Sequence, residues 1–112
     1  MNADNIKSQM RKGYLEYCIL LILKKKPAYT SDIISELKDA KLIVVEGTLY
    51  PLLTRLKNGE LLDYKWEEST QGPPRKYYEM TVQGQSFLDE LERSWEEINN
   101  VVTKIKASPI FS

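Results

Sequence analysis

Hydrophobic positions in residues 46–57 recur with the spacing of one helical face. Four leucines follow one another at i, i+3, i+4 and i+7, namely Leu49, Leu52, Leu53 and Leu56. This spacing places them on one stripe of a helix whose other face is polar. Pro51 lacks an N–H and is expected near the helix start. Asn58–Gly59 is expected to end the helix, because both residues tolerate a left-handed backbone. The pattern predicts an amphipathic helix, although an ordinary core helix has the same pattern.

Three further segments have helical periodicity. They cover residues 5–25, 30–40 and 81–106, and Thr81 is the expected N-cap of the last of these helices. Positions 17–23 are nearly all apolar, so the first helix is expected to be buried on more than one side, with one side covering the domain and the other covered by a second copy of the chain. Thr30, Ser31 and Asp32 are typical of a capped helix start. The helix that they begin is joined to the helix at 46–57 by a short apolar link. This pair is a candidate helix-turn-helix, although any small helical bundle shares the pattern.

A β-hairpin is expected directly after this helix pair. Leu62, Tyr64 and Trp66 alternate with charged residues, which is the pattern of a half-buried strand. The expected segments are a strand at 61–67, a turn at 71–74 and a second strand at 75–80. The sequence therefore predicts a mainly α fold with a two-stranded wing, that is, a winged helix-turn-helix followed by a long C-terminal helix.

The last helix carries a heptad seam. Its positions alternate spacings of four and three, at Gly84, Leu88, Leu91, Trp95, Ile98, Val102 and Ile105. The preceding residues form a complete domain, so the apolar seam of this helix is expected to have no partner within its own chain. We therefore expect it to pack against a second copy in a two-fold dimer. The expected dimer contacts are Leu88, Leu91, Trp95, Ile98, Val102 and Ile105. The chain thus divides into a winged domain at 1–80, a dimerisation helix at 81–106 and a tail at 107–112.

Composition and charge argue against several classes of protein function. Lys+Arg and Asp+Glu both number 16, so the formal net charge of +0 does not by itself indicate a nucleic-acid partner. The chain has no histidine and one cysteine, Cys18, so we expect no intrachain disulfide, no enzyme activity, no cofactor and no metal. The apolar run at 15–23 is too short to cross a bilayer and contains Glu16. A cytoplasmic protein is expected.

Eight side chains are candidate DNA contacts. They are Thr30, Ser31, Thr48, Tyr50, Thr54, Arg55, Arg75 and Lys76. Those on the 46–57 helix are types that touch base edges and phosphates. Arg55 is the one strong candidate for reading guanine, although it lies far from the helix start, and its other role is phosphate binding. Arg75 and Lys76, beside the hairpin turn, suit phosphates, although a solvated strand edge also carries such residues. We interpret the lysines at 24–26 as a helix-end charge cluster rather than a DNA contact.

These motifs resemble one family. Similarity to the PadR family of bacterial transcriptional regulators is carried by the blocks GTLYPLLTRLKNGELL, DYKWEES and GPPRKYYEMTVQG, within a resemblance that runs from about Gly13 to Ile105. It implies a winged helix-turn-helix homodimer that represses its target promoter. A two-fold dimer would bind a palindromic operator with half-sites about one helical turn, or a multiple, apart. The alternative is a winged-helix protein-interaction module without DNA binding, which the zero net charge keeps open.

The resemblance also implies a small-molecule site. The short chain with a single C-terminal helix is similar to the compact subfamily, in which a lactococcal multidrug-resistance regulator stacks flat aromatic drugs on a tryptophan of the last helix. Trp95 occupies the matching place, and Tyr14, Tyr17 and Asn99 are its candidate neighbours. Stacking would use the large π-surface of the indole, and a cationic ligand would be held over the same ring. The other role open to Trp95 is packing in the dimer core.

Overall fold

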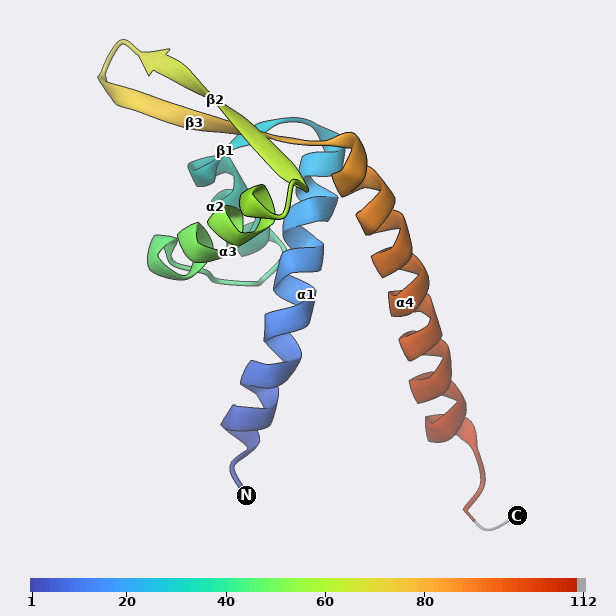
Figure 1. Ribbon diagram of the computed structural model, residues 1–112. Coiled ribbons are helices and arrows are strands. Elements are labelled where there is room, and N and C mark those ends of the chain that lie inside the picture. The colour runs from blue at the N-terminus through green and yellow to red at the C-terminus, as the bar shows by residue number, and fades with distance from the viewer. Residues whose placement is uncertain (111–112) are drawn as a thin grey trace.

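The computed structural model describes residues 1–110, which form four helices and a small antiparallel sheet (Figure 1). In chain order the elements are α1 (Ala3–Lys25), β1 (Ala28–Tyr29), α2 (Thr30–Asp39), α3 (Glu46–Asn58), β2 (Leu62–Ser69), β3 (Gly72–Met80) and α4 (Val82–Ala107). The expected mainly helical fold, with a hairpin wing and a long last helix, is confirmed. The expected tail begins after Ala107, and its last two residues, 111–112, lie outside the described part of the chain.

The hydrophobic core lies where α1, α2 and α3 meet the base of the hairpin. Ile19 and Leu20 of α1 are adjacent in the sequence and both fully buried. Neighbouring helix positions point about 100° apart, so α1 is covered on two sides. One side packs on α2, and the other packs on α4, where Leu88 is also fully buried. The first helix is buried on more than one side, as predicted, but α4 of the same chain covers the side that was expected to need a second copy.

The sheet has the strand order β1-β3-β2, with antiparallel pairing throughout. The hairpin turn lies at Thr70–Gln71, because Ser69 pairs with Gly72 and the two prolines that follow belong to β3. The expected turn at 71–74 is therefore displaced. The strand β1 was not predicted, since a two-residue strand has no periodicity. Leu62 is buried at the base of β2, whereas Trp66 is 62% exposed further along, so the outer hairpin projects from the domain.

The backbone after α3 differs from the prediction. The left-handed residue is Glu60, with φ of 65°, while Gly59 has φ of −80°. The N–H of Glu60 donates to the Lys57 carbonyl at 3.0 Å and that of Leu61 to the Leu56 carbonyl at 3.0 Å. These two bonds form a Schellman motif, which places the left-handed residue one position later than Asn58–Gly59.

Two further positions on the helix pair are corrected by the structure. The helix α3 begins at Glu46, so Pro51 is its sixth residue and lies in the second turn rather than at the helix start. The N-cap of α2 is Tyr29, and Thr30 is the first helical residue. The Asp32 carboxylate accepts a hydrogen bond from the Tyr29 N–H at 3.0 Å, which satisfies one donor at the start of α2.

The start of α4 is fixed against the loop between α3 and β2. Thr81 is the N-cap, as the sequence predicted, and its hydroxyl oxygen accepts from the Gly84 N–H at 2.9 Å. The same hydroxyl donates to the Glu60 carbonyl at 2.6 Å. Gly84 is buried, and a Cβ at this position would overlap the Leu61 carbonyl oxygen and lie 2.7 Å from Met80 Cγ. The absence of a side chain at Gly84 is what lets α4 approach the loop.

Beyond its first turns α4 leaves the domain, and Figure 1 shows its C-terminal half diverging from the N-terminal half of α1. Every residue from 93 to 107 is exposed. The Cα radius of gyration is 17.0 Å, against about 13 Å for a compact chain of this length. Leu88, in contrast, is 0% exposed within its own chain. The prediction that Leu88 contacts a second copy is therefore wrong, because the first turns of α4 do have something of their own to cover.

Candidate nucleic-acid interface

The helix α3 presents three distinct faces. Its core face carries Leu49, Leu53 and Leu56, all buried. With about 100° between successive residues, the face directly opposite carries the exposed residues Gly47, Pro51, Thr54 and Asn58. Tyr50 flanks this outward face on one side, and Thr48 and Arg55 flank it on the other. Of the four candidates on this helix, Thr54 and Arg55 therefore point furthest from the core, on opposite sides of this stripe, while Tyr50 and Thr48 lie nearer to it.

The flank with Tyr50 belongs to a groove between the wing and the starts of α2 and α3. The groove has a volume of about 420 Å³. Its lining residues are Tyr29, Thr30, Ser31, Glu46, Tyr50, Trp66, Pro73, Pro74, Arg75 and Lys76. Five of the eight candidate DNA contacts meet here, although they come from three separate segments. We call this feature the wing groove.

Both wing cations are held by aromatic rings. The Arg75 guanidinium carbon lies 4.0 Å from the centre of the Tyr29 ring. The Lys76 ammonium lies 4.5 Å from the centre of the Tyr64 ring and 5.5 Å from that of Trp66. Such cation–π contacts orient the charged groups without neutralising them. The wing therefore presents two oriented positive charges at the groove.

Aromatic partners in the wing groove were missed by the sequence reasoning. Trp66 had been assigned to the buried face of a strand, yet it is exposed beside Lys76. Tyr29 carried no predicted role, because nothing marked the two-residue strand β1 that holds it next to Tyr77, with ring centres 4.8 Å apart. The alternation of the hairpin did place Tyr64, Trp66 and Lys76 on one face, which was the available signal.

The opposite flank of α3 faces α1. Thr48 and Arg55 line a second cavity, with a volume of about 640 Å³, between α1, the 42–45 link and α3. Arg55 Nη1 lies 3.3 Å from Glu16 Oε1, and the two side chains are 74% and 19% exposed. The structure therefore does not present Arg55 as a free reader of guanine. Because the Arg55 side chain is largely exposed, water screens this ion pair, which contributes only about 1 kcal/mol. A DNA phosphate can therefore compete with Glu16 for the guanidinium.

Comparison with known proteins identifies this arrangement. Residues 19–90 match the model of the transcriptional regulator PadR-like family. The chain belongs to the PadR-like family of transcriptional regulators. Its members are regulators and not enzymes. A PadR-like transcription factor from Bacteroides fragilis has a similar structure, with a TM-score of 0.80 and 71% identity, covering 90% of this chain and 98% of that one.

More distant relatives have the same architecture. A PadR-like transcriptional regulator from Bacillus cereus has a TM-score of 0.79 and 34% identity, over 90% of this chain and 99% of its own. A PadR family transcriptional regulator from Eggerthella lenta has a TM-score of 0.78 and 33% identity, over 95% of this chain and 96% of its own. Each of these similarities covers 90% or more of this chain, so the fold is shared over most of its length.

The candidate effector residues of this PadR-like regulator lie between α1 and α4. The rings of Tyr17 and Trp95 have centres 6.1 Å apart with an interplanar angle of 38°, and Trp95 is 43% exposed. Tyr14 is half-buried one turn before Tyr17, and Asn99 is exposed one turn beyond Trp95. The structure thus brings two of the four candidates into contact and places the other two on the same pair of helices.

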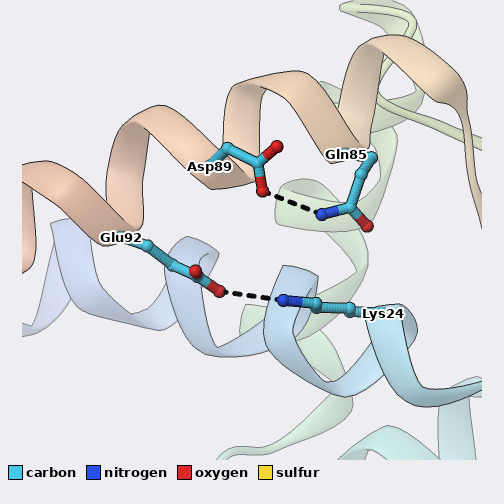
Figure 2. Close-up of polar contacts among 4 residues, drawn as sticks. All are labelled: Lys24, Gln85, Asp89 and Glu92. Atoms are coloured by element: carbon cyan, nitrogen blue, oxygen red, sulfur yellow. Dashed lines mark hydrogen bonds and ion pairs between the residues drawn. The ribbon is translucent and has the colours of Figure 1, made fainter.

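Polar contacts fix the two helices close to this aromatic pair. Figure 2 shows Lys24 of α1 reaching Glu92 of α4, with Nζ 3.3 Å from Oε1, beside a Gln85–Asp89 hydrogen bond of 3.0 Å within α4. Burial raises the pKa of the Tyr17 phenol, and the negative charge of Glu92 adds to this rise. The phenol therefore remains a neutral hydrogen-bonding group at neutral pH.

Two of the three lysines at the end of α1 form ion pairs with neighbouring helices. Lys24 pairs with Glu92 of α4, and Lys25 Nζ lies 3.8 Å from Glu36 Oε1 of α2. These ion pairs tie the end of α1 to two neighbouring helices. They agree with the interpretation of the cluster as a helix-end feature rather than a DNA contact.

Three features of residues 1–110 concern metal binding, thiol reactivity and membrane-spanning helices. No group of three or more His, Cys, Asp or Glu side chains there is arranged to hold a metal ion. Burial raises the pKa of the Cys18 thiol, which keeps it protonated and poorly nucleophilic. None of the helices in this part of the chain is long and apolar enough to cross a membrane.

Proposed function

We propose that this PadR-like regulator binds duplex DNA as a homodimer and represses transcription from a promoter with a palindromic operator. The observation that carries the proposal is the wing groove, where hydroxyls, an aromatic ring and two oriented cations meet beside α3. Phosphates are contacted by such groups, and base edges are read by a helix in the major groove. We place the protein in the cytoplasm, where its DNA target lies.

Each candidate residue has a role in this proposal. Thr54, on the outward face of α3, contacts base edges in the major groove, and Tyr50 contacts DNA from the side of the wing. Arg75 and Lys76 bind phosphates. The hydroxyls of Thr30 and Ser31, at the start of α2, contribute further contacts to the DNA backbone. Thr48 and Arg55, on the α1 side of α3, do the same, since Arg55 is held beside Glu16.

The dimer is proposed to form through the exposed half of α4. Residues with large exposed apolar side chains follow the seam there: Trp95, Ile98, Val102 and Ile105. Leu91 is half-buried against the core of its own chain and lies at the edge of this surface. A two-fold arrangement of such surfaces is self-complementary and gives two recognition helices on one face of the dimer, which matches a palindromic operator.

A small-molecule effector is proposed at the aromatic pair of Tyr17 and Trp95. The pair is partly exposed and lies near the carboxylates of Glu92 and Glu96, which are among the causes of the raised Tyr17 pKa. Flat aromatic or cationic molecules fit such a surface, with Tyr14 and Asn99 at its edges. Because α4 also joins the dimer, a ligand that favours one α1–α4 arrangement would shift the spacing of the two recognition helices and relieve repression.

The second candidate function is a winged-helix protein-interaction module that does not bind DNA. The net charge of +0 favours it, since non-specific attraction to phosphates is then weak. It predicts no binding to any duplex, even at low salt.

The wing cations are tested by removing them together. In the Arg75→Ala/Lys76→Ala protein, the slope of log Kobs against log salt concentration is expected to fall in magnitude by about 4 per dimer, because two phosphate contacts are lost from each subunit. Fluorescence anisotropy with a labelled duplex at several salt concentrations measures this slope. The matched control is Lys104→Ala/Lys106→Ala, which removes the same charge from the last turn of α4. An unchanged slope in the wing variant would exclude the wing from the DNA interface.

A further inference from the structure

The outward face of α3 combines two residues that disfavour helices. Gly47 is its second residue and Pro51 its sixth, one turn apart on the stripe opposite the buried leucines. Glycine costs backbone entropy in a helix, and proline beyond the first turn removes a hydrogen bond. The stripe continues through Thr54 and Asn58, so it carries neither charge nor a bulky side chain.

Packing within the chain does not require glycine at position 47. A Cβ built there meets nothing within 4 Å, whereas one built at Gly84 would overlap the backbone of Leu61. Gly47 has no positive φ either. The chain also contains a comparison position, Gly13 of α1, which is exposed and equally free of neighbours. The effect of the missing side chain at Gly47 is therefore on the solvent-exposed face of α3, where it leaves the helix backbone accessible to a binding partner.

Pro51 adds a hydrogen-bond acceptor to this open backbone. In an α-helix the carbonyl of residue i accepts from the N–H of residue i+4. Proline has no N–H, so Pro51 cannot supply this donor to the Gly47 carbonyl. The carbonyl oxygen is left with acceptor capacity on an exposed face, and the Pro51 ring beside it offers a small apolar surface. One A·T pair supplies complements to both, since the adenine N6 amino group is a donor and the thymine C5 methyl group is apolar.

We propose that Gly47 and Pro51 form a close-approach surface that reads an A·T pair in the major groove. The Gly47 carbonyl accepts from the adenine amino group, and the Pro51 ring packs on the thymine methyl group. The proposal rests on the proposed DNA-binding function and names the feature of α3 that gives it selectivity. Arg55, which is paired with Glu16, contacts the sugar–phosphate backbone of the DNA rather than a base.

The first test compares two alanine substitutions. An operator is selected from a random duplex pool with the wild-type protein, and its affinity is measured for Gly47→Ala and for Gly13→Ala. Both variants are expected to melt at the wild-type temperature or above, since alanine favours helix. Gly47→Ala is expected to bind the operator at least about tenfold more weakly, with unchanged binding to random duplex. Gly13→Ala is expected to bind both duplexes as the wild type does.

A second test probes the proline and the methyl group. Pro51→Ala restores a donor for the Gly47 carbonyl, so it is expected to raise the melting temperature while reducing selectivity for the operator. Uracil in place of each operator thymine in turn is expected to weaken wild-type binding at one position of each half-site, and to have no effect on Pro51→Ala at that position. Wild-type operator affinity in Gly47→Ala, or equal uracil effects in the wild type and Pro51→Ala, would overturn the proposed close-approach surface. Either result would leave the proposed DNA-binding function standing. A wild-type protein that selects no duplex would overturn the proposed function together with this surface.

Discussion

Replacing Gly84 with alanine is expected to destabilise the fold by about 3 kcal/mol or more. The added Cβ would overlap the Leu61 carbonyl oxygen, which is backbone and cannot turn aside, and would lie 2.7 Å from Met80 Cγ. Relief requires α4 to move away from the α3–β2 loop. That movement would strain the hydrogen bonds through which Thr81 caps α4 and reaches the Glu60 carbonyl. A domain of this size has a free energy of unfolding of roughly 5–15 kcal/mol, so the loss is a large part of it.

Urea denaturation followed by circular dichroism measures this loss. Gly13→Ala is the matched control, because it makes the same change in a helix where a Cβ meets no atom within 4 Å. The control is expected to be as stable as the wild type or slightly more stable. Equal midpoints for the wild type and Gly84→Ala would show that α4 does not approach the loop as closely as described.

Placing charge on the exposed seam of α4 is expected to separate the proposed dimer into folded monomers. Ile98 and Val102 are 57% and 44% exposed in the single chain, so glutamates at both positions leave the core of each chain intact. In a two-fold interface each glutamate appears twice, and four unpaired carboxylates would have to be buried. Operator affinity is expected to fall by at least about a hundredfold, since the two half-sites are then bound independently.

Sedimentation velocity and anisotropy with the operator duplex measure these two effects. The control is Asn100→Glu/Thr103→Glu, which adds the same charge to exposed positions on the opposite face of α4. It is expected to remain a dimer and to bind as the wild type does. A dimeric Ile98→Glu/Val102→Glu protein would show that α4 is not the interface.

Periodicity predicted those elements whose residues repeat over several turns or strand positions. The four leucines of α3 and the alternation in β2 extend far enough to define a face, and the Thr81 cap lies at the start of a long helix. The two-residue strand β1 has no repeat to detect, and the left-handed Glu60 results from the hydrogen bonds that close α3. Local patterns predicted elements, whereas the details at their ends depend on backbone hydrogen bonding.

The sequence predicted which residues share one surface of a helix or strand better than it predicted what that surface packs against. The seam of α4 was predicted correctly as a stripe, but Leu88 covers the core of its own chain while Ile98 is exposed. Arg55 was predicted on the polar side of α3, but its ion pair with Glu16 joins residues far apart in the sequence. The wing groove likewise combines three separate segments, so it became visible only in the folded chain.

The most direct measurement is the binding of the wild-type protein to a labelled duplex from the promoter upstream of its own gene, across a salt series, with a scrambled duplex as competitor. Tight, salt-dependent binding is predicted, with the promoter preferred over the scrambled duplex by at least about a thousandfold. Binding that is absent from both duplexes even at the lowest salt concentration would contradict the proposed function and favour a protein partner for this winged helix.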